Sequence, residues 1–250
     1  MANWNDPQPP RQSAGFGASP SLNGEVIGGR AGFDAGLRRH MLSIYNYMAS
    51  GILLSGVVAM LFANSGFAAK IVGTPLWWVI ALAPLGFVFG MSLGANRMKT
   101  STLQALFWGF CVVMGLSLST IFLVFTGASI ATTFVATSAA FAGLSLYGYT
   151  TKRDLSGMGT FLIMGVWGLL VAMLVNMFVQ SSAMQFAISA IGVLIFAGLT
   201  AYDTQKLRAI YFQVAGSEFA GKAVVLGALN LYLDFINMFQ FMLSFIGDRR

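Results

Sequence analysis

Long apolar stretches dominate this 250-residue chain and restrict how it can fold. A helix needs about 20 mainly apolar residues to cross the hydrocarbon core of a bilayer. About seven stretches approach that length, with short polar segments between them. Their approximate limits are residues 41–63, 77–95, 103–125, 128–149, 160–178, 186–206 and 224–246. This pattern predicts an all-α membrane protein with about seven transmembrane helices.

The charge content agrees with a membrane protein and excludes a water-soluble one. Only 9% of the residues are charged and 57% are hydrophobic, whereas a soluble domain has roughly 25% charged residues. The formal net charge is +6, but the basic residues stand in short clusters between apolar stretches. That distribution is typical of the positive-inside rule and not of a phosphate-binding patch. We therefore expect the lipid bilayer as the surroundings and no nucleic-acid partner.

The positions of lysine and arginine predict the orientation. With a cytoplasmic N-terminus, most basic residues between the stretches fall on the cytoplasmic side, which is the arrangement the positive-inside rule favours. The predicted cytoplasmic residues are Arg38, Arg39, Arg97, Lys99, Lys152, Arg153, Lys206, Arg208 and Lys222, and the predicted external ones are Lys70, Arg249 and Arg250. Seven spans then place the C-terminus outside, and six spans with a re-entrant last segment would return it to the cytoplasm.

The chain divides into a polar start and an apolar remainder. Residues 1–37 are rich in glycine, proline, serine and asparagine and contain no apolar segment typical of a signal peptide. Too little apolar surface is available there to offset the entropy of ordering, so we predict a flexible polar N-terminal tail. Residues 38–250 form the predicted seven-helix domain.

Small residues at four-residue spacing predict how the helices pack. Such spacing lets two helix backbones approach closely. It occurs at Gly86, Gly90 and Gly94, at Gly51 with Ser55, and at Gly115 with Ser119. We interpret all three sets as packing sites within the chain and not as a dimer interface.

Two aspartates, Asp203 and Asp234, stand inside the last two apolar stretches. A carboxylate at membrane depth costs roughly 2.5–3.5 kcal/mol on insertion scales, so such a residue indicates a functional site. The other acidic residues all fall in the predicted tail or in loops. The pair is therefore the candidate site.

Polar neighbours share a helix face with each aspartate. Asn230, Asp234 and Asn237 lie within about 60° of arc on a helix, and Thr200 shares a face with Asp203. Because lipid disfavours both polar faces, we expect them to point into the bundle and towards each other. Asn230, Asn237 and Thr200 are predicted to line the site.

Two adjacent carboxyl groups in a poorly hydrated bundle are expected to share a proton and to titrate in coupled steps. Loss of that proton would separate the helices or recruit a cation. Arg97, close after the second stretch, is the predicted counter-charge. Asp203 and Asp234 also form a candidate calcium site, weak and transient, because calcium prefers about six to eight oxygens and no further acid occurs between Asp34 and Asp154.

The chain contains few of the residues that other kinds of catalytic or metal site require. Cys111 is the only cysteine and His40 the only histidine, so clusters of these two ligand types and a disulfide are excluded by count. We expect His40 at the membrane edge, far from the serines of the spans. The chain is therefore not predicted to be an enzyme, and no resident cofactor is expected beyond transient calcium.

Three motifs resemble a known family. They are YGYTTKRDLS at 147–156, AYDTQ at 201–205 and LYLDFIN at 231–237, and together they resemble the Bax inhibitor-1 (transmembrane Bax inhibitor motif) family. The resemblance covers roughly residues 33–247, including FDAGLRRHMLSIYNYM at 33–48, which is similar to the beginning of bacterial members.

The resemblance implies a seven-helix fold with the last helix at its centre, in a bacterial inner membrane. It also implies a proton-sensitive calcium leak gated by a di-aspartyl pair, which by motif would be Asp203 and Asp234, locked by an arginine after the second span, here Arg97. A pH-sensitive calcium leak channel or regulator of ion homeostasis is therefore the leading hypothesis, with calcium ions and protons as its ligands.

Two alternatives remain open. The first is a non-conducting interaction protein that modulates a membrane protease or a stress response, with a membrane-protein partner. The second is an intramembrane aspartyl protease, since a carboxyl dyad can activate water. The protease is disfavoured because Leu-Tyr-Leu precedes Asp234, where such enzymes carry Gly-x-Gly.

Overall fold

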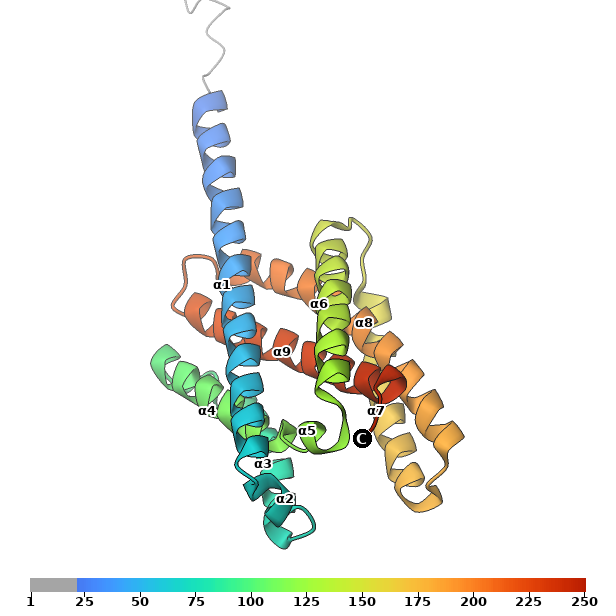
Figure 1. Ribbon diagram of the computed structural model, residues 1–250. Coiled ribbons are helices and arrows are strands. Elements are labelled where there is room, and N and C mark those ends of the chain that lie inside the picture. Colours follow the sequence, from blue (N-terminus) through green and yellow to red (C-terminus); the bar gives the residue numbers. More distant parts are fainter. Residues whose placement is uncertain (1–21) are drawn as a thin grey trace, which may run out of the picture. The chain divides into compact units, whose positions relative to one another are not determined.

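The computed structural model describes residues 22–250, with side chains from residue 35 onward. Residues 37–250 form one compact unit, and the description below concerns that unit (Figure 1). The helices are α1 (Leu22–Asn64), α2 (Phe67–Ile71), α3 (Pro75–Gly94), α4 (Thr100–Leu118), α5 (Ile121–Val124), α6 (Gly127–Thr150), α7 (Ser156–Val179), α8 (Ser182–Val214) and α9 (Phe219–Ile246). Within the described residues, extended pairing is limited to a single bridge between Phe125 and Arg249.

Seven of these helices are long and apolar enough to cross a membrane, which confirms the predicted all-α multi-pass membrane fold. The first of these spans lies within α1 and ends at Asn64. Residues 1–21 of the predicted tail lie outside the described residues, and from Leu22 the chain is helical. The α8 helix continues to Val214, past the predicted limit at residue 206, because its polar last turns contain no glycine or proline to end it.

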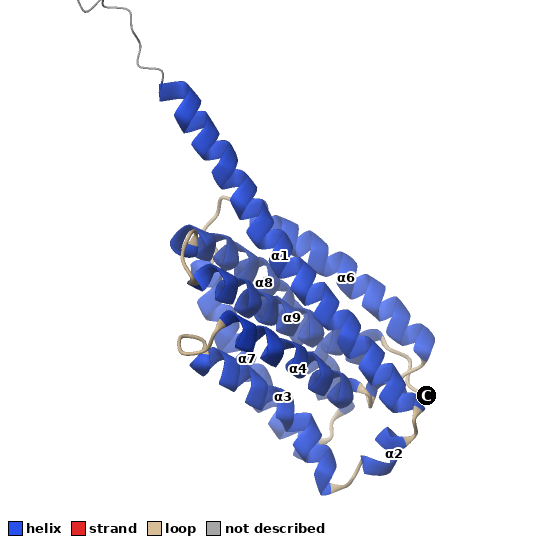
Figure 2. Cartoon of the chain, turned by 90° about the vertical axis from the view of Figure 1, so that its left-hand side faces the viewer, coloured by secondary structure: helices blue, strands red, loops and turns tan. Residues whose placement is uncertain are grey.

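Helix α9 lies at the centre of the unit, with the other long helices around it (Figure 2). In the most apolar 18-residue stretch of α9, 56% of the residues are buried, against 11% for the corresponding stretch of α3 at the periphery. Val225, Leu231, Tyr232 and Met238 are fully buried. A membrane helix that carries a carboxyl group and two amides on one face is expected to lie inside the bundle, because lipid disfavours that face. The central position of the last helix agrees with the resemblance.

A buried hydroxyl of α1 joins α9 and α4. The Tyr232 hydroxyl lies 2.6 Å from Oγ of Ser55 and shares a hydrogen bond with it. Ser55 Oγ also donates to the carbonyl oxygen of Cys111, at 2.7 Å. Since an unpaired polar group is costly in an apolar interior, these bonds fix the relative position of the three helices.

The predicted small-residue contacts are confirmed between α1 and α4 and are wrong for α3. A Cβ atom at Gly115 would lie 2.6 Å from the carbonyl oxygen of Ser55, and one at Gly51 would lie 2.8 Å from Sγ of Cys111. At Gly86 and Gly90, by contrast, no described atom outside the helix lies within 4 Å of the Cβ position. Gly86 and Gly90 therefore face outward on the least buried span, whereas a Cβ atom at Gly94 would meet the side chain of Met98 in the following connection.

The contrast between Gly115 and Gly90 predicts opposite effects of the same substitution. Gly115→Ala forces a Cβ against a backbone carbonyl, so we expect it to destabilise the fold by about 1–3 kcal/mol. Gly90→Ala meets open space and gains helix propensity, which stabilises by up to about 1 kcal/mol. Thermal unfolding of the detergent-solubilised variants measures both effects. Equal melting temperatures for the two variants would contradict the packing described.

Candidate functional site

The structure brings the carboxyl groups of Asp203 and Asp234 together. Asp203 lies on α8 and is partly buried, and Asp234 lies on α9 and is only 4% exposed. The two side chains are within hydrogen-bonding reach of each other. Helix α9 packs along α8, with Leu207 against Gly227, which sets the carboxyl groups face to face. Two acids 31 positions apart in the chain thus form one site.

One oxygen of this pair has no hydrogen-bond partner among the described residues. It is the buried Oδ2 atom of Asp234. The positive charge that acts on both carboxyl groups is the exposed Lys206, one turn beyond Asp203 on α8. Its ammonium group lies 5.9 Å from the centre of the Tyr202 ring. The pair therefore has a single lysine at its edge and an unsatisfied oxygen in its interior.

Arg97 is placed differently from Lys206. It stands exposed in the connection between α3 and α4, and in the described structure no hydrogen bond or ion pair joins it to either aspartate. That connection is held to the start of α9, because Nζ of Lys222 donates to the carbonyl oxygen of Ala95 at 3.1 Å. In this conformation the sequence-predicted counter-charge does not contact the pair, and its role stays a prediction.

The other predicted lining residues bond largely to their own helices. Thr200 Oγ1 donates to the Phe196 carbonyl at 2.8 Å, and Asn237 Nδ2 donates to the Leu233 carbonyl, also at 2.8 Å. Asn230 is partly buried on α9. The side-chain oxygen of Asn237 is left available as an acceptor.

A chain of hydroxyl groups next to the pair was not predicted from the sequence. Tyr45 of α1 bonds to Ser145 of α6 at 2.6 Å, and Ser145 bonds to Thr204 of α8 at 2.9 Å. Thr204 follows Asp203 directly in the chain and donates to the carbonyl of Thr200. The four-residue spacing of Thr200 and Thr204 was the available signal.

The first two family motifs meet beside the site. Gln205 accepts a hydrogen bond from the Leu155 amide at 2.9 Å and donates to the Arg153 carbonyl at 2.7 Å. Gly148 lies against the backbone of Ala201, where a Cβ atom would collide with the carbonyl group. These contacts fix the α6–α7 connection against α8, the helix that carries Asp203.

Asp154 in that connection is exposed and lies outside the membrane segments. Hydrogen bonds from the side chain and the amide of Ser156 hold the pKa of its carboxyl below the usual range, the amide lying 2.9 Å from Oδ1. Asp154 therefore remains ionised where a proton-sharing pair would titrate. It provides a matched control for the two membrane aspartates.

Metal-binding side chains are few around the pair. From residue 35 onward, no group of three or more histidine, cysteine or acidic side chains lies close enough together to hold an ion. His40, expected at the membrane edge, is buried between α1 and α8, with its ring 5.4 Å from that of Tyr211. It is buried because it faces α8 and not the surrounding solvent.

The chain matches a known protein family and several bacterial proteins. The family described as "Inhibitor of apoptosis-promoting Bax1" matches residues 37–250, which is the whole compact unit. The chain belongs to the Bax inhibitor-1 family. This member is 45% identical over 228 residues to "Uncharacterized protein RP147" of Rickettsia prowazekii (87% of this chain, 93% of that protein). It is 44% identical over 220 residues to "Inner membrane protein YbhL" of Escherichia coli K12 (86% of this chain, 94% of that protein).

The Gln205 contacts generate a prediction for this Bax inhibitor-1 family member. Gln205→Ala removes the partner of the buried Leu155 amide, a hydrogen bond with a net contribution of about 0.5–1.5 kcal/mol. We expect amide hydrogen exchange in residues 151–155 to accelerate roughly two- to tenfold. The exposed Gln213→Ala is the control and leaves that exchange unchanged. Equal protection in both variants would show that Gln205 does not hold the connection.

Proposed function

We propose that this protein is a pH-sensitive leak pathway for cations, calcium foremost, gated by Asp203 and Asp234. The observation that carries the proposal is the contact between two carboxyl groups inside membrane-spanning helices. Intramembrane ionisable residues are costly and usually mark ion or proton pathways. Asp203 and Asp234 both carry that cost, and in addition their two acidic groups contact each other.

The proposed gate works through the proton that the pair shares. While one proton lies between the carboxyl groups, α8 and α9 stay packed and the pathway is closed. When the proton leaves, two negative charges face each other in surroundings of low dielectric, where their repulsion is much stronger than in water. The helices then separate, or a cation takes the place of the proton.

Calcium fits the oxygens that the site offers. Two carboxylates, the free side-chain oxygen of Asn237 and the amide of Asn230 are hard oxygen ligands of the kind calcium prefers. They supply fewer protein ligands than the about six to eight oxygens of a tight site. Such a site suits passage of the ion and not its storage.

The membrane and the orientation are part of the proposal. The printed name of the Escherichia coli relative places that protein in the inner membrane, and we assign the same membrane to this chain. The clustered basic residues of the α3–α4, α6–α7 and α8–α9 ends support a cytoplasmic N-terminus under the positive-inside rule. The aspartyl pair, next to Lys206, then lies towards the cytoplasm.

Neutralising one aspartate tests the gate. Loss of one carboxylate removes attraction on the order of several kcal/mol for a nearby divalent ion, so we expect Asp203→Asn to lower calcium flux roughly tenfold or more. Its pH dependence is lost as well, because no proton is then shared between two acids. Calcium entry into dye-loaded proteoliposomes, measured from acidic to alkaline pH, reports both quantities.

Asp154→Asn is the matched control for this experiment and leaves the pH profile unaltered. Wild-type protein that is shown to be folded and gives no flux at any pH would overturn the channel proposal. It would favour the interaction hypothesis, which predicts flat flux for every variant.

A second experiment separates the two candidate counter-charges. Lys206→Gln removes a positive charge that favours the ionised carboxyl groups, so the pair keeps its shared proton more firmly. We therefore expect a lower basal leak, by up to about fivefold for an exposed charge worth about 0–1 kcal/mol. Arg97→Gln is expected to leave the leak unchanged in this conformation. A larger effect of Arg97→Gln would assign the lock to Arg97, as the family resemblance implies.

A further inference from the structure

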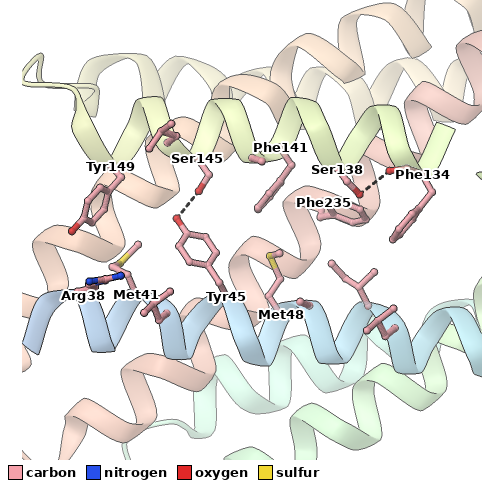
Figure 3. A pocket seen from close by; sticks show the side chains of 16 residues that line it. Arg38, Met41, Tyr45, Met48, Phe134, Ser138, Phe141, Ser145, Tyr149 and Phe235 are labelled. Carbon is pink, nitrogen blue, oxygen red and sulfur yellow. Dashed lines mark hydrogen bonds between the residues drawn. The ribbon is translucent and has the colours of Figure 1, made fainter. Parts of the chain in front are cut away.

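A large apolar groove lies between α1 and α6, the two helices that the hydrogen bond between Tyr45 and Ser145 joins. Its volume is about 700 Å³, within the range of roughly 300–1,000 Å³ typical of ligand sites. Figure 3 shows α1 along one side, α6 along the other and Phe235 of α9 in the floor. None of its lining belongs to the aspartyl pair, so the groove is a separate feature.

The body of the groove is apolar and open towards the side. Met41, Met48 and Phe141 are buried in its walls. Leu53 and Leu146 form its rim and are 64% and 63% exposed, so the groove opens towards the surroundings of the bundle. The surroundings of a membrane-spanning helix at this depth are lipid chains.

One end of the groove is cationic. Arg38 and Tyr149 stand at this end, opposite Phe134 at the other end (Figure 3). Arg38 forms no hydrogen bond or ion pair with any residue from position 35 onward. Tyr149 in turn contacts a second arginine: Arg208 donates to the Tyr149 carbonyl at 2.9 Å and lies 5.7 Å from the centre of the Tyr149 ring.

We propose that this groove binds one acyl chain of an anionic phospholipid, with the phosphate group at Arg38. Among the residues from position 35 onward, that arginine is the only charged one in the lining, and none of the lining residues described is an acid that would oppose an anion. The polar groups along its middle, Tyr45 and Ser145, already bond to each other. An apolar chain with an anionic head therefore matches both the cationic end and the body.

The dimensions agree with a lipid chain. From Arg38 to Leu53 the groove follows about 22 Å of α1, at 1.5 Å per residue. One leaflet of the hydrocarbon core is about 15 Å thick, so an acyl chain fits within this length. A helix of the same length and about 10 Å diameter occupies about 1,700 Å³, so a groove of this size favours the thinner acyl chain over a helical segment.

Competition between two lipids tests the charge. The purified full-length protein is mixed in detergent with equal amounts of phosphatidylglycerol and phosphatidylcholine, and bound lipid is counted by native mass spectrometry. The wild type is expected to retain phosphatidylglycerol preferentially. Arg38→Gln lowers that preference about fivefold, the effect of one basic residue near a lipid surface. Arg39→Gln, an exposed neighbour outside the groove, leaves it unchanged.

A blocked groove tests the site. Ala142→Trp places a large ring inside the groove and is expected to remove the retained lipid of both kinds. Ala139→Trp, an exposed position of the same helix outside the groove, retains it. Equal losses in Arg38→Gln and Arg39→Gln would indicate general surface attraction and overturn the proposal. Unchanged retention in Ala142→Trp would overturn it too, and thermal unfolding confirms that each variant is folded.

Discussion

Burial of a carboxyl-bearing helix is the constraint on which this structure depends. A charged or polar group facing lipid is costly, and α9 carries Asp234 at its middle. Surrounding α9 with other helices removes that cost, and the centre of the unit is where this is possible. The close approach of α1 and α4 at Gly51 and Gly115, and the hydroxyl contact of Tyr232 with Ser55, hold that arrangement. The packing that surrounds α9 therefore also places Asp234 inside the bundle, next to Asp203.

The family motifs acquire a physical reason from their contacts. Gly148 is small because Ala201 crosses it, and Gln205 is an amide because it both accepts from Leu155 and donates to Arg153. Each of these residues fixes α8 relative to the α6–α7 connection. The position of Asp203 towards α9 therefore depends on residues more than 45 positions earlier in the chain.

A chain of hydrogen bonds leads from the apolar groove to the turn of α8 that carries Asp203. Tyr45 lines the groove, and its hydroxyl bonds to Ser145, which bonds to Thr204 beside Asp203. Hydroxyl contacts of this kind between membrane helices contribute about 0.6 kcal/mol on average. They hold α1, α6 and α8 in position relative to one another. They also provide hydrogen-bond partners for the hydroxyl groups of Tyr45 and Ser145, which line the groove.

The sequence alone determined the lengths of the seven apolar stretches and the presence of an aspartate in each of the last two. Both features depend only on local composition. Seven spans, the all-α class and the facing of Asp203 towards Asp234 follow from those patterns. The tertiary structure decided what depends on how each helix is rotated against its neighbours. That rotation turned Gly86 and Gly90 outward and placed Lys206 beside the pair where Arg97 was predicted. It also left a groove between α1 and α6 that no stretch of sequence marks, since a cavity is defined by the gap between two helices and not by either one.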